Sequence, residues 1–184
     1  MAQQAAATEA EESIVIDLRN PGRAALLAWL WPGAGHLYQR RYGKGTLFMV
    51  CILALYFFGL KISHGHAVYA SWTKEDKRWQ YFCQVGVGAP ALPALIQAAL
   101  VFHDKKPLFG GLLAPPHQPV DPDGPDELAQ WHLEMSSGFD MGTLYTMIAG
   151  LLNVLVIYDA LAGPFIASSE KEKASEKEPT DEAA

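Results

Sequence analysis

The sequence predicts an all-α integral membrane protein with four hydrophobic helices, the first of them short, plus a short amphipathic surface helix and disordered termini. Two observations lead to this fold class. Most acidic residues lie in 1–20, 104–140 and 168–184, while apolar residues gather elsewhere. Four stretches then carry no Asp, Glu, Lys or Arg: Ala24–Gln39, Gly45–Leu60, Trp79–His103 and Met141–Tyr158. A membrane span needs about 17 to 25 apolar residues, and the third and fourth stretches meet this length. The second is slightly shorter, but its flanking Lys44 and Lys61 can reach the membrane surfaces, and the first is short.

The chain divides into a membrane domain, residues 21–167, and two polar tails. The tails at 1–20 and 168–184 have few large apolar side chains, which predicts disorder. Residues 1–13 are small and acidic and lack the basic start of a cleavable signal, so the first hydrophobic segment is expected to be retained. The hydrophobic segments are expected at about 22–38, 44–63, 79–103 and 139–163, with an extramembrane loop at 104–138.

Proline and glycine mark where the segments begin and break. Asn20-Pro21 is a good start for the first helix, because proline suits the first helical turn. Pro32-Gly33 ends that helix. Pro90 and Pro93 lie inside the third segment, so a kink is expected there.

The fourth segment carries a row of small residues at four-residue spacing, namely Gly138, Gly142, Thr146 and Gly150. Such a row falls on one face of a helix and lets another backbone approach closely. We therefore expect this face to pack against another helix of the same chain. The alternative is that glycine is simply common in membrane helices.

Two polar residues follow in the same segment. Asn153 lies near its centre and is expected to hydrogen-bond between helices. Asp159 lies near its end, where a carboxylate at the negative end of the helix dipole needs a cation nearby. The first interpretation is an ion pair with Arg23, because a guanidinium can bind a carboxylate through two hydrogen bonds. The alternative is a transport role for Asp159. With four spans, Arg40 and Arg41 would lie across the membrane and are excluded as partners.

Charge counts orient this four-span topology. Both termini lie on one side, which holds nine Lys and Arg against five on the other. If the first segment re-enters instead of spanning, each side holds seven and the charges give no orientation. Because the more positive side faces the cytoplasm, the termini are expected there. Lys61 and Arg78 fall on the same side as Asp159 and are alternative partners for it. The three cations of the first loop, Arg40, Arg41 and Lys44, point to the opposite orientation.

The loop at 104–138 is the one sizeable extramembrane segment. Its first half is rich in proline and glycine, while its second half, "DELAQWHLEM", starts at Asp126 directly after Pro125, a sound helix start. Leu128, Trp131 and Met135 share one face, which predicts a short amphipathic helix on the membrane surface or on the other helices. Its polar face is acidic, so attraction to anionic lipid is not its anchor.

The stretch "WPGAGHLYQRRYGKG", residues 31–45, raises the question of a phosphate-binding loop. The stretch does not match a Walker loop, because Gly45 and not Ser or Thr follows Lys44. It does not match a dinucleotide-binding loop either, because Tyr38 occupies the position of the third glycine. A tight membrane hairpin remains as the interpretation. Its turn residues are Pro32, Gly33, Gly35, His36, Tyr38, Gly43 and Gly45.

Taken in order, these turn residues resemble the two-transmembrane-helix domain family, in which a Gly-rich stretch, an acidic or His residue, aromatic residues and later glycines join two helices. The resemblance covers about residues 24–62. The ending "GTLYTMIAGLLNVLVIYDALAGP" is similar to that of an uncharacterised bacterial family of four-helix membrane proteins with such a hairpin. This resemblance implies a location in a bacterial inner membrane and no assigned reaction.

The sequence offers no motif for a reaction. His64 and His66 lie close together, but the other four His are scattered. Neither His-Glu-x-x-His, Cys-x-x-Cys nor Gly-x-Ser-x-Gly occurs, so no catalytic residue, metal site or cofactor is predicted. A net charge of −6 disfavours nucleic acid as a partner. The expected partners are the lipid bilayer and other membrane proteins or further copies of the chain. We expect a non-enzymatic scaffold or subunit of a membrane complex; the alternative is a small transporter or channel component with Asn153 and Asp159 along a polar path.

Overall fold

The computed structural model describes residues 20–74, 76–117 and 126–163. Within these ranges the chain is helical and has no strand, only an isolated bridge between Trp72 and Lys77. The helices are α2 (Pro21–Leu30), α3 (Ala34–Tyr38), α4 (Tyr42–Ile62), α5 (Gln80–Gln84), α6 (Pro93–Phe102), α7 (Glu127–Met135) and α8 (Ser137–Ala162), with 3-10 turns η1 (Val85–Val87) and η2 (Phe109–Gly111). The tails predicted to be disordered lie outside the described residues.

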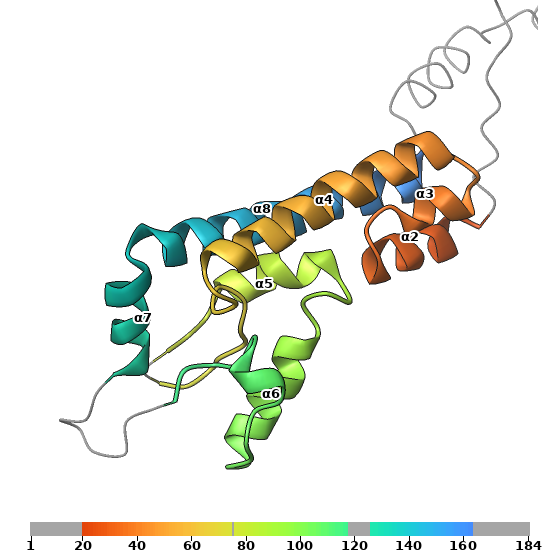
Figure 1. Ribbon diagram of the computed structural model, residues 1–184. Coiled ribbons are helices and arrows are strands. Elements are labelled where there is room, and N and C mark those ends of the chain that lie inside the picture. The colour runs from red at the N-terminus through yellow and green to blue at the C-terminus, as the bar shows by residue number, and fades with distance from the viewer. Residues whose placement is uncertain (1–19, 75, 118–125, 164–184) are drawn as a thin grey trace, which may run out of the picture.

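Helices α4 and α8 form the long axis of the molecule and lie side by side (Figure 1). They are 21 and 26 residues long, and in the described part of the chain these two are long and apolar enough to cross a membrane. At 1.5 Å per residue they measure about 32 and 39 Å. They run antiparallel and touch at a glycine pair: a Cβ on Gly59 would lie 2.8 Å from the carbonyl oxygen of Gly142. Close backbone contact here depends on the absence of both side chains.

The first predicted segment, 22–38, is not one helix but the short pair α2 and α3. The chain reverses at Gly33, whose φ of +80° suits glycine, and a Cβ there would overlap the carbonyl oxygen of Gly45. Helix α3 thus returns to the end of the molecule where α2 begins. There the amide of Gln39 donates to the carbonyl of Ala160, in the last turn of α8 (2.7 Å).

The third predicted segment, 79–103, breaks completely where a kink was expected. Helix α5 and η1 end at Gly88, which has a φ of +83°, and α6 begins at Pro93. Proline lacks an amide hydrogen, so Pro90 and Pro93 cannot continue the helical ladder. A Cβ on Gly88 would overlap the carbonyl oxygen of Trp29. The chain turns where it meets α2.

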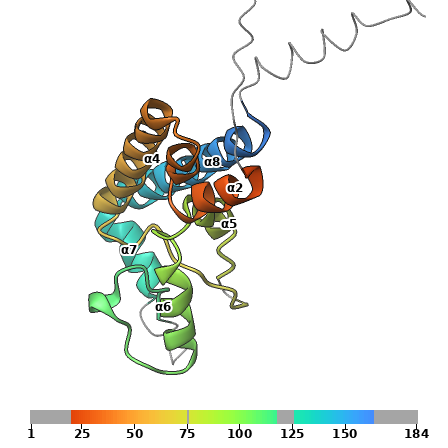
Figure 2. The ribbon, with the colours of Figure 1, turned by 90° about the vertical axis from the view of Figure 1, so that its right-hand side faces the viewer.

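The two broken segments approach each other along α8 from opposite ends. Gln84 of α5 bonds to Thr146, towards the start of α8, whereas Gln39 bonds to Ala160 near its end. The facing ends of the two segments, called the tips below, meet in a backbone hydrogen bond from the amide of Ala89 to the carbonyl of Leu30 (3.0 Å). Figures 1 and 2 show α2 and α5 on the same side of the long pair, with α6 extending away from it. The four-helix prediction is therefore replaced by two long helices and two half-length hairpins.

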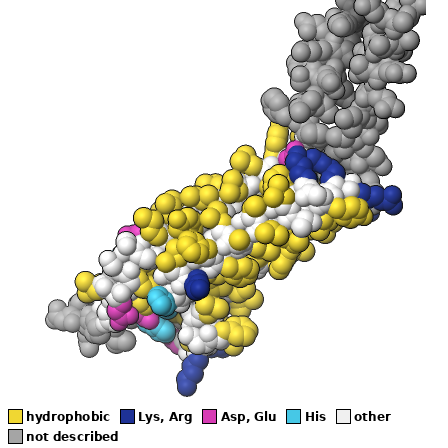
Figure 3. All heavy atoms as spheres, turned by 45° about the horizontal axis from the view of Figure 1, so that its top comes forward, with side chains coloured by type: hydrophobic (Ala, Val, Ile, Leu, Met, Phe, Trp, Pro, Cys, Tyr) yellow, Lys and Arg dark blue, Asp and Glu magenta, His cyan; other side chains and the backbone are white. Residues whose placement is uncertain are grey.

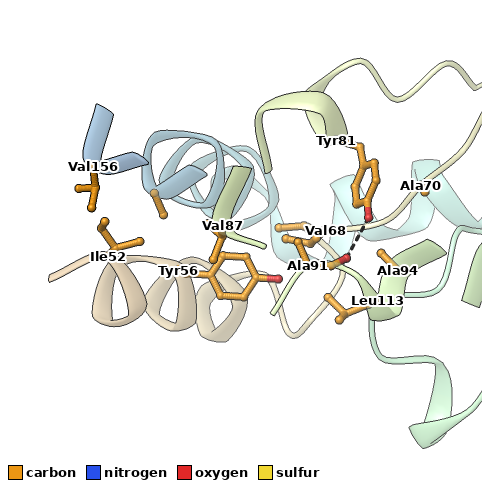
Figure 4. Packing of buried hydrophobic residues seen from close by; sticks show 12 residues of the cluster. Ile52, Tyr56, Val68, Ala70, Tyr81, Val87, Ala91, Ala94, Leu113 and Val156 are labelled. Carbon is orange, nitrogen blue, oxygen red and sulfur yellow. Dashed lines mark hydrogen bonds between the residues drawn. The ribbon is translucent and has the colours of Figure 1, made fainter. Parts of the chain in front are cut away.

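A buried cluster joins the tips to the long helices (Figure 4). Ile52 and Tyr56 of α4 and Val156 of α8 belong to it, together with Val87. The hydroxyls of Tyr56 and Tyr81 donate to the carbonyls of Pro90 and Ala91, each at 2.9 Å. The Ala91 carbonyl also accepts from the amide of Ala94 (3.2 Å), whereas Pro93, three residues after Pro90, has no amide hydrogen to donate to the Pro90 carbonyl. The two tyrosines therefore stabilise the turn.

Helix α7 is the helix predicted after Pro125, and it lies at the start of α8. The Asp126 side chain caps it by accepting from the amide of Leu128 (3.0 Å). Trp131 is buried and stacks on His66 with ring centres 4.2 Å apart, and it also contacts Tyr69. The apolar side of α7 is thus held by the loop that follows α4 and by α8.

Candidate functional site

The strongest cluster of charge lies at the end of α8 (Figure 3, upper right). Lys44 Nζ lies 3.0 and 2.8 Å from Oδ1 and Oδ2 of Asp159. Arg41 Nη2 lies 3.2 Å from Oδ2, and His36 Nε2 lies 2.6 Å from it. Lys44, Arg41 and His36 belong to the connection between α2 and α4, so this cluster ties that connection to α8.

The predicted partner of Asp159 was wrong. Arg23 makes no ion pair with Asp159 in the described structure, whereas Arg41, which the four-span topology excluded, makes one. The physical reason is the reversal at Gly33: since α2 and α3 return to the same end, the following cations lie on the side of Asp159. These cations also compensate the negative end of the α8 dipole.

His36 completes the site from the buried side. Its side chain is fully buried and meets Phe48 edge to face, with ring centres 5.2 Å apart. Because a carboxylate can only accept, His36 must carry a proton on Nε2 to bond to Asp159. Burial lowers the pKa of His36, against the raising effect of its hydrogen bond to Asp159, while its buried Nδ1 has no hydrogen-bond partner. Both observations favour a neutral imidazole that donates from Nε2.

The other predicted turn residues shape this connection. Pro32 is buried behind Trp31, the residue that caps α2, and a Cβ on Gly35 would overlap the carbonyl oxygen of Ala24. Gly45 faces the Leu37 side chain, 2.8 Å from the position of a Cβ, whereas Gly43 faces open space. Tyr38 packs on the small buried cluster of Ala24, Ala28 and Ala160. Most of these residues thus serve a close contact between α2, α3 and the ends of α4 and α8.

Asn153 lies where the two broken segments meet. Its side chain is fully buried, and Nδ2 donates to the carbonyls of Ala28 (3.0 Å) and Gly86 (2.9 Å). Ala28 lies near the end of α2 and Gly86 in η1, so one amide bonds to both tips. Its Oδ1 has no hydrogen-bond partner in the structure. The contact is between helices, and no charged side chain takes part in it.

The small-residue row on α8 faces two different elements. A Cβ on Gly138 would lie 3.1 Å from the carbonyl oxygen of Ile62, and Gly142 faces Gly59, so both contact the end of α4. Thr146 accepts from Gln84 (2.9 Å), and a Cβ on Gly150 would overlap the carbonyl oxygen of Cys83. The row therefore contacts α4 at one end and α5 in the middle.

The burial of two polar residues was not predicted from the sequence, and Arg78, an alternative partner for Asp159 there, is bonded elsewhere. Arg78 stacks against Tyr69 and Phe139 (4.5 and 5.1 Å from its guanidinium carbon to the ring centres), and its Nη2 donates to the Ala67 carbonyl and the Thr143 hydroxyl. Gln84 bonds to the same carbonyl and to Thr146. Burial lowers the pKa of Arg78. In the sequence, a charge next to an apolar stretch gave no sign of burial, since flanking Lys and Arg normally face water.

Together these residues make polar contacts along the length of α8. In order along the helix, the contacts are Arg78 with Thr143, Gln84 with Thr146, Asn153 with the two tips, and His36 with Asp159. Between Asn153 and Asp159 the fully buried side chains of Ala24, Ala28 and Ala160 pack together. In the described ranges no three His, Cys, Asp or Glu side chains come together as a metal site requires. The arrangement holds helices together through neutralised charge and donated hydrogen bonds.

Comparison with known proteins places the chain in a family. The model of a family of unknown function (DUF6677) matches residues 23–173, and the chain belongs to that family. The match includes every described helix except the first residues of α2. No curated protein and no solved structure matches the chain.

Proposed function

We propose that this family member is an integral membrane protein in which α4 and α8 cross the bilayer and the two hairpins enter it from opposite sides. The observation that carries the proposal is the outward-facing apolar surface of the long helices. Only 22% of the most apolar window of α4 and 33% of that of α8 is buried. A core helix of a water-soluble protein would be mostly covered, and soluble monomers rarely expose apolar patches of this extent.

The broken segments are compatible with a bilayer, because their irregular backbone is covered by protein. Backbone outside a helix is tolerated at membrane depth where other groups satisfy it. Here Tyr56 and Tyr81 bond to the carbonyls of the 88–92 turn, and Asn153 bonds to the carbonyls of Ala28 and Gly86. Such an arrangement supports two hairpins that dip into the membrane and return.

In this topology both termini lie on the side of Asp159, and we place that side in the cytoplasm of a bacterium, with the chain in the inner membrane. The positive-inside rule counts Lys and Arg near the ends of spans. Within about 20 residues of α4 or α8, the termini side holds seven of them: Arg23, Arg40, Arg41, Lys44, Lys171, Lys173 and Lys177. The other side holds four within about 20 residues of α4 or α8: Lys61, Lys74, Lys77 and Arg78. With four spans, the cations Arg40, Arg41 and Lys44 of the first loop opposed this orientation. Because the chain reverses at Gly33, they now lie on the termini side and support it.

Cysteine labelling tests the topology. In a Cys51→Ala, Cys83→Ala background, Arg23→Cys, Arg40→Cys and Lys61→Cys place single thiols at exposed positions. We expect a membrane-impermeant maleimide added to intact cells to react with Lys61→Cys and to spare the other two until the membrane is opened. Labelling of Arg23→Cys and Arg40→Cys from opposite sides would restore the four-span topology. Recovery of the full chain in the soluble fraction would overturn the membrane proposal.

Within the membrane, we propose a non-enzymatic role as a scaffold or subunit of a complex with other membrane proteins or further copies of the chain. The charges and polar groups of the described site are engaged in holding helices together, which supports a structural role. Affinity purification in mild detergent tests it. A defined partner or a stable homo-oligomer that survives purification is expected; a lone monomer would argue against it.

A second candidate is a small transporter or channel component. One observation favours it: polar side chains from three segments make contacts at successive points along α8, Asn153 and Asp159 among them. The packed alanines between Asn153 and Asp159 disfavour a permanently open path. Flux of protons or small cations into vesicles containing the purified protein, abolished by Asn153→Leu, would establish this candidate over the first.

A further inference from the structure

A cleft of about 850 Å³ lies between α6 and the loop before α5, at the end of the molecule opposite Asp159. Its size falls within the range of small-molecule sites, about 300–1,000 Å³. One wall is apolar and includes Trp72, Ala98 and Phe102. Lys105 and Lys106 lie on its rim, and both are exposed. The cleft is thus apolar on one side and cationic on the other.

The folding of the chain behind α6 fixes this shape. The buried amide of Gln97 donates to the carbonyls of Leu108 (2.7 Å) and Leu112 (2.8 Å), and its Oε1 accepts from the amide of Leu108 (2.9 Å). These three bonds fold residues 108–112 back onto α6. The intervening turn presents Lys105 and Lys106 beside the exposed ring of Phe102.

The rim carries more positive than negative charge. Asp104 is the one acid among the lining residues, against the two lysines. His117 also lines the cleft, but its ring and amide both bond to Glu127, which offsets any charge it carries (3.0 and 2.6 Å). The charge of the rim therefore complements an anionic group.

The surface around the cleft has the character of a membrane interface. Trp72, Trp79 and Phe82 form a group of contacting rings, and all three are more than half exposed. Phe102, which lines the cleft, and Phe109 are 84% and 83% exposed. Exposed Trp with nearby Lys is typical of the level where lipid headgroups meet acyl chains.

We propose that this cleft binds an anionic membrane phospholipid, with the phosphate at Lys105 and Lys106 and the upper acyl chain against Phe102 and Trp72. The proposal rests on the membrane location proposed above. A lipid is the occupant that fits both halves of the cleft, because its headgroup matches the cationic rim and its chain matches the apolar wall. It reaches the cleft from the bilayer past the exposed aromatic rings.

Quenching of Trp72 fluorescence by brominated lipid tests the proposal. The full-length protein is placed in two sets of phosphatidylcholine vesicles. One set contains brominated phosphatidylglycerol, and the other contains the same amount of brominated phosphatidylcholine. The difference between the unmodified protein and the Trp72→Phe variant gives the fluorescence that comes from Trp72. We expect greater quenching of Trp72 by the anionic lipid, and loss of this difference in Lys105→Gln/Lys106→Gln. The matched control, Lys74→Gln/Lys77→Gln, removes the same charge from exposed lysines that do not line the cleft, and should retain it.

Each other outcome overturns the proposal in a distinguishable way. Equal quenching of Trp72 by both lipids in the unmodified protein would mean that the cleft does not select an anionic headgroup. Equal loss of the preference in both double variants would assign it to overall charge and not to the cleft. Absence of quenching by either lipid would overturn the membrane location together with this site. Unchanged quenching by phosphatidylcholine in the variants reports that they remain folded and inserted.

Discussion

Lys44 donates from Nζ to both carboxylate oxygens of Asp159, across 115 residues of sequence. The side chain of Asp159 is 22% exposed and that of Lys44 37%. The pair is therefore neither fully solvated nor fully buried. It joins the first turn of α4 to the last turn of α8, and so fixes the antiparallel register of the two long helices at the end opposite the Gly59–Gly142 contact.

A double-mutant cycle should detect this coupling. Exposed pairs contribute about 0–1 kcal/mol and removal of one partner of a buried pair costs about 3–5 kcal/mol, so Asp159→Asn is expected to cost an intermediate amount, about 1–2 kcal/mol. Thermal unfolding in detergent would measure it. Combined with Lys44→Met, the cost should be non-additive by at least about 0.5 kcal/mol. Combined with Arg23→Gln, it should be additive; coupling to Arg23 instead of Lys44 would contradict the observed pair.

Gly150→Ala should destabilise the protein because a Cβ there overlaps the carbonyl oxygen of Cys83. Forcing apart two packed backbones is expected to cost about 1–3 kcal/mol. Gly43→Ala is the matched control, because a Cβ at Gly43 meets nothing within 4 Å. The melting temperature in detergent should fall for the first variant and stay constant or rise for the second. Equal melting temperatures for both would mean that α5 does not rest on Gly150.

Sequence patterns predict the long and regular parts of this fold. The second and fourth hydrophobic segments are α4 and α8, because no proline and no Asp, Glu, Lys or Arg interrupts Gly45–Leu60 or Met141–Tyr158. The start of α7 follows from Asp126, a good N-cap whose hydrogen bond to Leu128 is local. Such features depend only on neighbours in sequence, and this is why they can be predicted.

The two reversals could not be predicted in this way. Hydropathy treats 22–38 and 79–103 like the other segments, and proline is compatible with either a kink or a break. The choice is made by contacts between distant residues: Gly33 against Gly45, and Gly88 against Trp29. The partner of Asp159 depends in turn on the first reversal, so the same error placed Arg41 on the wrong side.

Asn153 should be required for the meeting of the two tips. Asn153→Leu removes the donor for the carbonyls of Ala28 and Gly86, and buried carbonyls without a partner cost about 1–3 kcal/mol. Asn153→Asp should be worse, since an ionised carboxylate cannot donate and adds charge beside two carbonyl oxygens. The melting temperature is expected to be highest for the unmodified protein, lower for Asn153→Leu and lowest for Asn153→Asp. A Leu variant as stable as the unmodified protein would contradict a bridging role for the amide.

Acid should weaken the contact between α7 and the rest of the protein through His66. Burial lowers the pKa of His66, against the raising effects of Glu127 and Glu134 and with a lowering contribution from His64. The folded state therefore binds a proton less readily than the unfolded state, whose His has a pKa of about 6.5. It follows that the stability contributed by neutral His66 is present above this pH and is lost as the pH falls below it.

The melting temperature should drop between about pH 7.5 and 5.5, and His66→Phe, which keeps a ring against Trp131, should reduce the drop. His64→Gln, at an exposed position, serves as the control and should leave most of the drop in place. A drop of the same size in His66→Phe would show that other groups govern the acid response.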